Sequence, residues 1–169
     1  LGHFIVAKAG TSVTKFTFII SVGLGLASSF MHDAAAVSIG IVTMLPLMRS
    51  AGIEPHSRTA KFMLISLAFA CSCGGMGTLV GGGRTMVSAA FLKEFTGIEI
   101  SFMDWIKYAM PMAIVTVPAA VGVVYLVFRP DPAIQLPRFD DEVPPWSKEE
   151  ILTLIIIVSS FILWLTKEI

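Results

Sequence analysis

Apolar residues run from Phe16 to Met48, interrupted in the middle by one ionisable pair, His32-Asp33. Each half of this run has 15 residues, fewer than the roughly 17–25 that a membrane-spanning helix needs. The whole run is too long for one straight helix across a bilayer. The pattern therefore predicts a re-entrant hairpin over residues 16–49, formed by two short helices that meet at a polar tip. Hydrocarbon tolerates an ionisable pair only where protein or water covers it, so the tip is a candidate functional site.

A second apolar segment, residues 60–96, is interrupted by glycine. Six of the ten residues from 74 to 83 are Gly, and each costs a helix about 1 kcal/mol relative to Ala. We expect the helix to end in this stretch and to resume at Met86. Irregular backbone at membrane depth is tolerated only where protein or a cavity satisfies its polar groups. The segment is therefore predicted to be a discontinuous transmembrane helix.

The rest of the chain alternates polar connectors with apolar segments. We predict an amphipathic lead-in at residues 1–15, a transmembrane helix at 104–128, a Pro- and acid-rich linker at 129–148 and a last transmembrane helix at 149–169. Lys and Arg are concentrated in the lead-in, the connector at 49–61 and the linker. Since cytoplasmic loops carry an excess of these residues, the linker is predicted to be cytoplasmic.

Composition supports a membrane location. The 169 residues are 55% hydrophobic and 14% charged, whereas a soluble domain has about 25% charged residues. The mean hydropathy is +0.82. We therefore expect an all-α, multi-pass integral protein of the cell membrane, which is the inner membrane in a Gram-negative bacterium. Lys+Arg and Asp+Glu balance at 12 each, which gives no indication of a nucleic-acid partner.

The ends of the chain and its cysteines add less. The chain starts without Met and ends just after an apolar segment, so we expect it to be an internal part of a longer protein. Cys71 and Cys73 are two residues apart, which on a helix points them in different directions. A disulfide between them is not expected, and both are interpreted as small packing residues.

The hairpin tip offers binding groups for both signs of charge. The first arm ends there with free carbonyl groups, which favour a cation, and the second begins with free N–H groups, which favour an anion. Ser28 and Ser29 add hydroxyl groups, and Asp33 adds a carboxylate that either binds a ligand or caps the second arm. The alternative is that His32-Asp33 is a structural pair that fixes a tight turn.

Arg84 follows the glycine run and is the only basic residue between Lys61 and Lys93. A guanidinium group binds carboxylate, sulfate or phosphate through two parallel hydrogen bonds. Thr85 could cap the resuming helix. The alternative is an ion pair between Arg84 and Asp33, and the two roles are compatible if an anion competes for Arg84. The glycine run lacks the Gly-Lys-Ser/Thr ending of a nucleotide-binding loop.

A hairpin tip that faces a broken helix is the arrangement of secondary transporters, and two motifs carry a family resemblance. The stretch Ser28–Leu47 resembles the first hairpin of the divalent-anion:sodium symporter (DASS) family of the ion-transporter superfamily. His32-Asp33-Ala34 stands where that family has Ser-Asn-Thr, and Met44-Leu45-Pro46-Leu47 closes the arm. The run 74–85 is similar to the family's Gly-Gly-x-Gly-Thr-x-x-Gly motif. The resemblance covers about residues 12–128.

This resemblance implies an inverted-repeat transporter fold, of which the chain would be a part that includes the start of the second repeat. It implies no enzyme activity but elevator-type transport of di- or tricarboxylates or sulfate by a homodimer in membrane lipid. Na+, or alternatively H+, would be the coupled ion. The Na+ site would be formed by Ser28, His32, Asp33, Gly77 and Gly81. The small anionic substrate would be bound by Asp33, Ala34, Thr78, Gly82, Gly83, Arg84 and Thr85.

Two other interpretations stay open. In a Na+/H+ antiporter or related ion carrier, Asp33 would be the titrating carboxylate, His32 its proton partner and Arg84 a structural residue. An intramembrane enzyme or a membrane scaffold is the third interpretation, and no nucleophile at a characteristic spacing supports it. Because His-Asp-Ala replaces Ser-Asn-Thr at the tip, the substrate and the coupled ion are both open.

Overall fold

The computed structural model describes residues 11–136 together with residues 151–153, 155–156, 159 and 163. Over residues 11–136 the chain is helical apart from connectors and one isolated bridge between Ser12 and Gln135. The predicted lead-in up to residue 10, the predicted linker from residue 137 and most of the last predicted span lie outside the described residues. The helices are α2 (Val13–Ala27), α3 (Asp33–Ser50), α4 (Arg58–Gly74), α5 (Gly83–Thr96) and α6 (Phe102–Val127).

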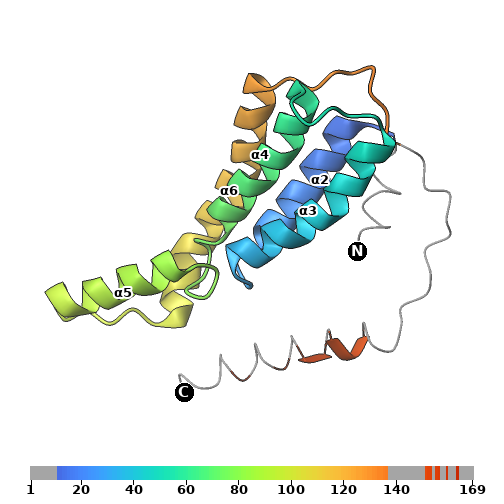
Figure 1. The fold of residues 1–169 in the computed structure, drawn as a ribbon. Coiled ribbons are helices and arrows are strands. Elements are labelled where there is room, and N and C mark those ends of the chain that lie inside the picture. Colours follow the sequence, from blue (N-terminus) through green and yellow to red (C-terminus); the bar gives the residue numbers. More distant parts are fainter. Residues whose placement is uncertain (1–10, 137–150, 154, 157–158, 160–162, 164–169) are drawn as a thin grey trace.

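Helices α2 and α3 lie side by side and are joined by a short turn (Figure 1). Helix α2 has 15 residues, as the apolar pattern indicates. Helix α3 has 18 residues, because it starts at Asp33 and continues past Met48 to Ser50. At about 1.5 Å per residue it is roughly 27 Å long, so the expectation that neither arm is long enough to span is wrong for α3. By length and composition alone, α3 and α6 could each cross a membrane.

The glycine-rich stretch separates α4 from α5. Helix α4 ends at Gly74 and α5 begins at Gly83, three residues earlier than the expected restart at Met86. Near this start the Thr85 hydroxyl lies 2.6 Å from the carbonyl oxygen of Gly82 and 2.8 Å from that of Leu79, and it can donate its one hydrogen fully to only one of them. The residue at the capping position is Gly82, which has no capping side chain. The expectation that Thr85 caps α5 is therefore wrong, and its hydroxyl instead ties the first turn to the preceding loop.

The core lies where α2, α4 and α6 pack together, with α3 against α4 (Figure 1). Small residues bring α2 and α4 close: a Cβ atom at Gly74 would lie 1.6 Å from the carbonyl oxygen of Gly25. Such approach through small residues is common between membrane helices. Cys71 and Cys73 are both free thiols, and Cys71 is fully buried. Bulkier side chains fill the rest of this core: Phe16, Met44, Phe62, Met63, Leu67, Val117 and Val121.

Helix α5 leaves this bundle and extends away from it (Figure 1). Of its residues only Thr85 is buried, and its exposed side chains include Met86, Val87, Phe91 and Phe95. Gly97 ends the helix in the left-handed conformation at φ 72°, which glycine adopts without strain. The discontinuous helix thus has one half in the bundle and one half outside it.

Candidate functional site

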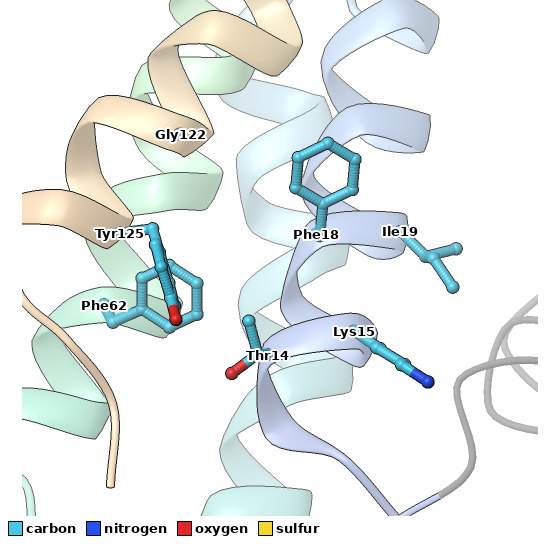
Figure 2. Close-up of a pocket in the computed structure, with 7 residues that line it drawn as sticks. All are labelled: Thr14, Lys15, Phe18, Ile19, Phe62, Gly122 and Tyr125. Atoms are coloured by element: carbon cyan, nitrogen blue, oxygen red, sulfur yellow. The ribbon is translucent and has the colours of Figure 1, made fainter. Parts of the chain in front are cut away.

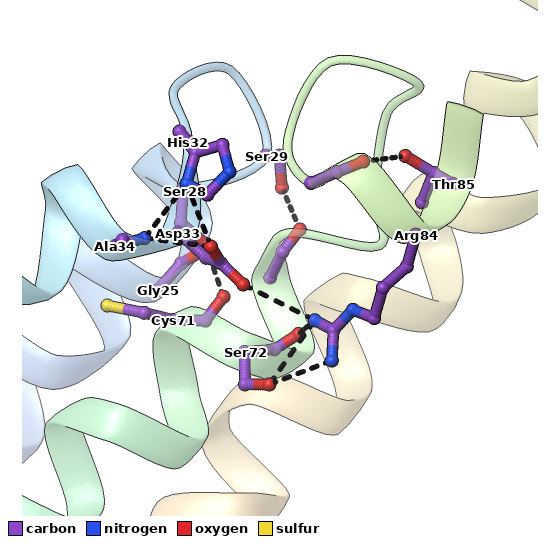
Figure 3. A network of polar contacts seen from close by, with 12 residues as sticks. Gly25, Ser28, Ser29, His32, Asp33, Ala34, Cys71, Ser72, Arg84 and Thr85 are labelled. Atoms are coloured by element: carbon purple, nitrogen blue, oxygen red, sulfur yellow. Dashed lines mark hydrogen bonds and ion pairs between the residues drawn. The ribbon is translucent and has the colours of Figure 1, made fainter. Parts of the chain in front are cut away.

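Four helix ends meet at the hairpin tip (Figure 3). Helices α2 and α4 end there with their carbonyl groups, while α3 and α5 begin there with their N–H groups. The backbone N–H of Asp33 donates to the carbonyl of Gly81 at 3.1 Å, which joins the start of α3 to the loop before α5. The partial charges of helix ends favour a cation beside the first pair of ends and an anion beside the second pair.

Ser28, Ser29 and Thr78 form a buried hydroxyl cluster at this junction, and none of the three is accessible to solvent. The Ser28 hydroxyl lies 2.7 Å from the carbonyl oxygens of both Gly25 and Cys71. A hydroxyl carries one hydrogen and can donate it fully to only one of them. The carbonyl oxygen that does not receive this hydrogen keeps a lone pair directed at the cluster, and such an oxygen can bind a cation.

The other two hydroxyls extend the cluster. Ser29 donates to the carbonyl of Gly74 at 2.7 Å, and Thr78 donates to the carbonyl of Ser29. The cluster therefore joins the tip to the last turn of α4 and to the glycine-rich loop. Its ligand atoms are neutral hydroxyl and carbonyl oxygens, the set that discontinuous helices offer to coupling ions in transporters.

Gly77 and Gly81 complete the wall of the cluster. A Cβ atom at Gly77 would lie 2.6 Å from the Ser29 hydroxyl, and one at Gly81 would lie 2.8 Å from the carbonyl oxygen of Ser28. Only glycine lets the loop backbone approach this closely. The structure thus brings together Ser28, Gly77, Gly81 and Thr78 from the sequence-based prediction.

His32, Asp33 and Arg84 form a charged edge beside the buried hydroxyl cluster (Figure 3). Asp33 Oδ2 lies 3.4 Å from Arg84 Nη2, and Asp33 Oδ1 lies 3.0 Å from His32 Nδ1. Their side chains are 26% exposed for Asp33, 58% for Arg84 and 63% for His32. The ion pair between Asp33 and Arg84 that the sequence suggested is therefore present. Within the described residues, no hydrogen bond or ion pair of the His32 side chain reaches the buried hydroxyls, so Asp33 is the only predicted Na+ ligand that this side chain contacts.

Arg84 is held mainly by α4. Its Nη2 lies 3.0 Å from the carbonyl oxygen of Ser72 and 3.3 Å from the Ser72 hydroxyl, and its Nη1 lies 3.3 Å from that hydroxyl. The last carbonyls of a helix lack partners within it, and a cation there is favourable. Arg84 therefore closes the C-terminal end of α4 although it belongs to α5.

The other predicted substrate residues contribute backbone. The N–H of Ala34 donates to Asp33 Oδ1 at 2.8 Å and lies 3.3 Å from His32 Nδ1. Gly82 and Gly83 begin α5, and nothing lies within 4 Å of a Cβ atom placed at Gly83. The Thr85 hydroxyl is already used within the loop. Arg84 is thus the one cationic side chain of the predicted substrate set.

Sequence reasoning missed Ser72 and the carbonyl groups of Gly25, Cys71 and Gly74. Ser72 lies 12 positions before Arg84, across a break whose geometry no periodicity describes, so no signal in the sequence pairs them. The carbonyls were equally hidden, since every residue has one. These three carbonyl groups are distinguished from all others only by the close packing of α2 and α4, which brings them to the hydroxyls of the tip.

Two further observations argue against a functional site elsewhere in the described residues. Within the described part of the chain, no group of three or more His, Cys, Asp or Glu residues could hold a metal ion. At the other end of the bundle, a cavity of about 330 Å³ lies between α2, α4 and α6 (Figure 2). Its lining is mostly apolar and unsuited to a small anion: Thr14, Lys15, Phe18, Ile19, Phe62, Gly122 and Tyr125. The tip is therefore the candidate site.

Comparison with known proteins decides the family, because all 169 residues match the CitMHS family, described as citrate transporter. The chain belongs to the citrate transporter family. It is 27% identical over 180 residues to the sodium-dependent dicarboxylate transporter SdcS of Staphylococcus saprophyticus, covering 97% of this chain and 34% of the relative. The SdcS protein of Staphylococcus aureus strain USA300 matches over 179 residues at 27% identity, with the same coverage.

An uncharacterized transporter of Haemophilus influenzae is 28% identical over 103 residues, which are 61% of this chain and 21% of the relative. The chain thus spans about a fifth to a third of the length of these curated relatives. Members of the citrate transporter family and these relatives are membrane transporters and not enzymes. The predicted kinship with the DASS family is confirmed.

Proposed function

We propose that this chain is part of a secondary active transporter of small di- or tricarboxylates that is driven by Na+. The observation that carries this proposal is the meeting of four helix ends, which sets neutral buried oxygens beside an exposed guanidinium. The first group suits a cation without its water shell and the second suits a carboxylate. A protein that binds both ions next to each other can couple the movement of one to the other.

The cation half of the site is the buried hydroxyl cluster. Ser28, Ser29 and Thr78 have their hydroxyls among backbone carbonyls at the ends of α2 and α4. Both helix ends carry partial negative charge. Na+ fits this set because alkali ions bind neutral oxygens, and the relatives named SdcS are sodium-dependent.

The anion half is Arg84 with the N–H ends of α3 and α5. Arg84 is more than half exposed, and its Nε–H has no hydrogen-bond partner in the described residues. A carboxylate can therefore approach the guanidinium. Sulfate would bind by the same chemistry, and uptake of labelled citrate, succinate and sulfate in parallel separates these substrates.

The rest of the predicted transporter belongs to the same proposal. We infer a multi-pass protein of the cell membrane, whose second inverted repeat completes the site and whose hairpin is re-entrant. We infer also a homodimer in lipid that works by elevator-type movement. Cross-linking of single-cysteine variants across the two membrane faces, with and without Na+, tests that movement.

The contact between His32 and Asp33 favours a second candidate, a Na+/H+ antiporter. In that case Asp33 would exchange H+ for Na+ and no organic anion would be needed. Proteoliposomes that contain a pH-sensitive dye distinguish the two: a Na+ gradient that moves protons without any carboxylate supports the antiporter. The contact of Asp33 with Arg84 argues for the carboxylate transporter, because it places a guanidinium beside the tip, where a substrate carboxylate could bind.

Uptake of labelled carboxylate by the full-length transporter in proteoliposomes tests the proposal. We expect uptake that requires a Na+ gradient and that Arg84→Ala abolishes, while Arg84→Lys keeps the charge but loses the two-pronged geometry and raises KM. Normal uptake by Arg84→Ala would contradict the assigned role. Thr96→Ala, on the exposed last turn of α5, is the matched control and should transport normally.

A further inference from the structure

The Asp33 carboxylate makes the longest of the hydrogen bonds to the guanidinium of Arg84. Its Nη2 atom carries two hydrogens but lies near three oxygens, at 3.0 Å from the Ser72 carbonyl, 3.3 Å from the Ser72 hydroxyl and 3.4 Å from Asp33 Oδ2. One of the three contacts must be weak at any moment. The Asp33 contact is the longest, and distance lowers the strength of a hydrogen bond.

Ser72 holds Arg84 in a way that does not depend on Asp33. Its hydroxyl faces both Nη1 and Nη2, and its carbonyl is at the end of α4, where no partner within the helix is available. These contacts fix the plane of the guanidinium against α4. Arg84 therefore keeps its position when the Asp33 contact breaks.

Asp33 also keeps its position without Arg84. Its other oxygen, Oδ1, accepts from the Ala34 N–H at 2.8 Å and lies 3.0 Å from His32 Nδ1. The backbone N–H of Asp33 is bound to the Gly81 carbonyl. The contact between Asp33 Oδ2 and Arg84 can thus open and close with neither residue losing its anchor.

On the basis of the proposed function, we propose that Asp33 is an internal competitor that occupies Arg84 until a substrate carboxylate replaces it, and that Ser72 is the positioning residue that holds Arg84 during this exchange. Because a substrate carboxylate takes the place of the Asp33 carboxylate at Arg84, the site selects ligands with a carboxylate group over neutral analogues. Asp33 lowers the apparent affinity for substrate and keeps Arg84 paired in the empty site. A competitor of this kind is overcome by substrate and leaves Vmax unchanged.

The test measures KM and Vmax for Na+-driven uptake of labelled succinate and citrate by the full-length transporter in proteoliposomes. Asp33→Asn keeps the shape but removes the charge, and we expect KM to fall about two- to fivefold, which corresponds to an exposed ion pair. Ser72→Ala should raise KM about two- to fivefold with Vmax unchanged, and Ser72→Thr, which restores a hydroxyl, should return KM close to wild type. Thr96→Ala is the control.

Three outcomes separate the possibilities. A lower KM in Asp33→Asn together with a higher KM in Ser72→Ala supports the proposal. An active wild type with an unchanged or raised KM in Asp33→Asn, in protein whose thermal stability is normal, would overturn the competitor role while the proposed function stands. A wild type that takes up neither carboxylate would overturn the proposed function and the competitor role together.

Discussion

The two halves of the tip differ in burial and in charge. The buried hydroxyl cluster is closed to solvent and contains only neutral oxygens, whereas the charged edge consists of the exposed His32 and Arg84 and the partly buried Asp33. Desolvating a full charge is far more costly than desolvating a hydroxyl that is hydrogen-bonded. The protein thus places neutral groups in its interior and charged groups where water or substrate can reach them. The difference predicts that each half serves one ion.

Substitution of Gly74 by Ala should have the largest effect, because it separates α2 from α4 and destroys the buried half. The new Cβ would meet the Gly25 carbonyl at 1.6 Å, and backbone cannot move aside as a flexible side chain can. Overpacking costs about 1–3 kcal/mol and more at rigid sites, so we expect a marked loss of folded protein and of transport. Thermal unfolding of the full-length transporter in detergent measures it.

Gly23→Ala is the matched control for that substitution. Gly23 lies on the same helix as Gly25, and nothing lies within 4 Å of a Cβ atom at this position. Its helix should be unchanged or more stable by about 1 kcal/mol, since Ala is the better helix former. If Gly74→Ala were as stable as Gly23→Ala, the close packing of α2 on α4 would be wrong.

Ser28→Ala should have the next largest effect, and it tests whether the buried hydroxyl cluster binds Na+. It removes the buried hydrogen bond from the Ser28 hydroxyl to the Gly25 or Cys71 carbonyl, and the Cys71 carbonyl then keeps only the Gly75 N–H as a donor. Such a loss costs about 1–3 kcal/mol, so the Na+ concentration for half-maximal uptake should rise about tenfold or more. KM for carboxylate at saturating Na+ should change less. Ser38→Ala, an exposed serine on α3, serves as the control, and an equal rise in both variants would refute the assignment.

His32→Ala should have the smallest effect, although the sequence draws most attention to this residue. The imidazole is exposed, and its role at the start of α3 is shared, because the Ala34 N–H is closer to Asp33 than to His32. Losing a helix cap costs about 0.5–2 kcal/mol, and we expect the lower end here with uptake nearly unchanged. A Na+ dependence lost in His32→Ala, measured by the same uptake assay, would place this residue in the ion site.

The sequence predicts the tip better than its internal contacts. The polar interruption at His32-Asp33 and the glycine run locate two breaks in helical structure, because charge and glycine both oppose an apolar helix. The pairing of Asp33 with Arg84 follows from their being opposite charges in apolar surroundings. The family resemblance supplied what composition could not, the prediction that Ser28, Gly77 and Gly81 belong to a Na+ site.

The remaining features depend on packing at atomic distance. Ser72 binds Arg84 only because the loop brings the first turn of α5 beside the end of α4, and no pattern in the sequence describes that turn. The Thr85 hydroxyl contacts the carbonyls of Leu79 and Gly82 in the loop before α5, a contact that the sequence does not indicate. Helix α3 is longer than its apolar run because helical hydrogen bonds continue through polar residues to Ser50.

Binding of ²²Na+ to the purified full-length transporter, in the absence of any carboxylate, tests the division of the site most directly. We expect the Arg84→Ala variant to bind Na+ with an affinity near that of wild type, because the buried hydroxyl cluster is intact. The Ser28→Ala variant should bind at least about tenfold more weakly. Equal loss of Na+ binding in both variants, or a loss in Arg84→Ala alone, would contradict the account that the two halves bind different ions.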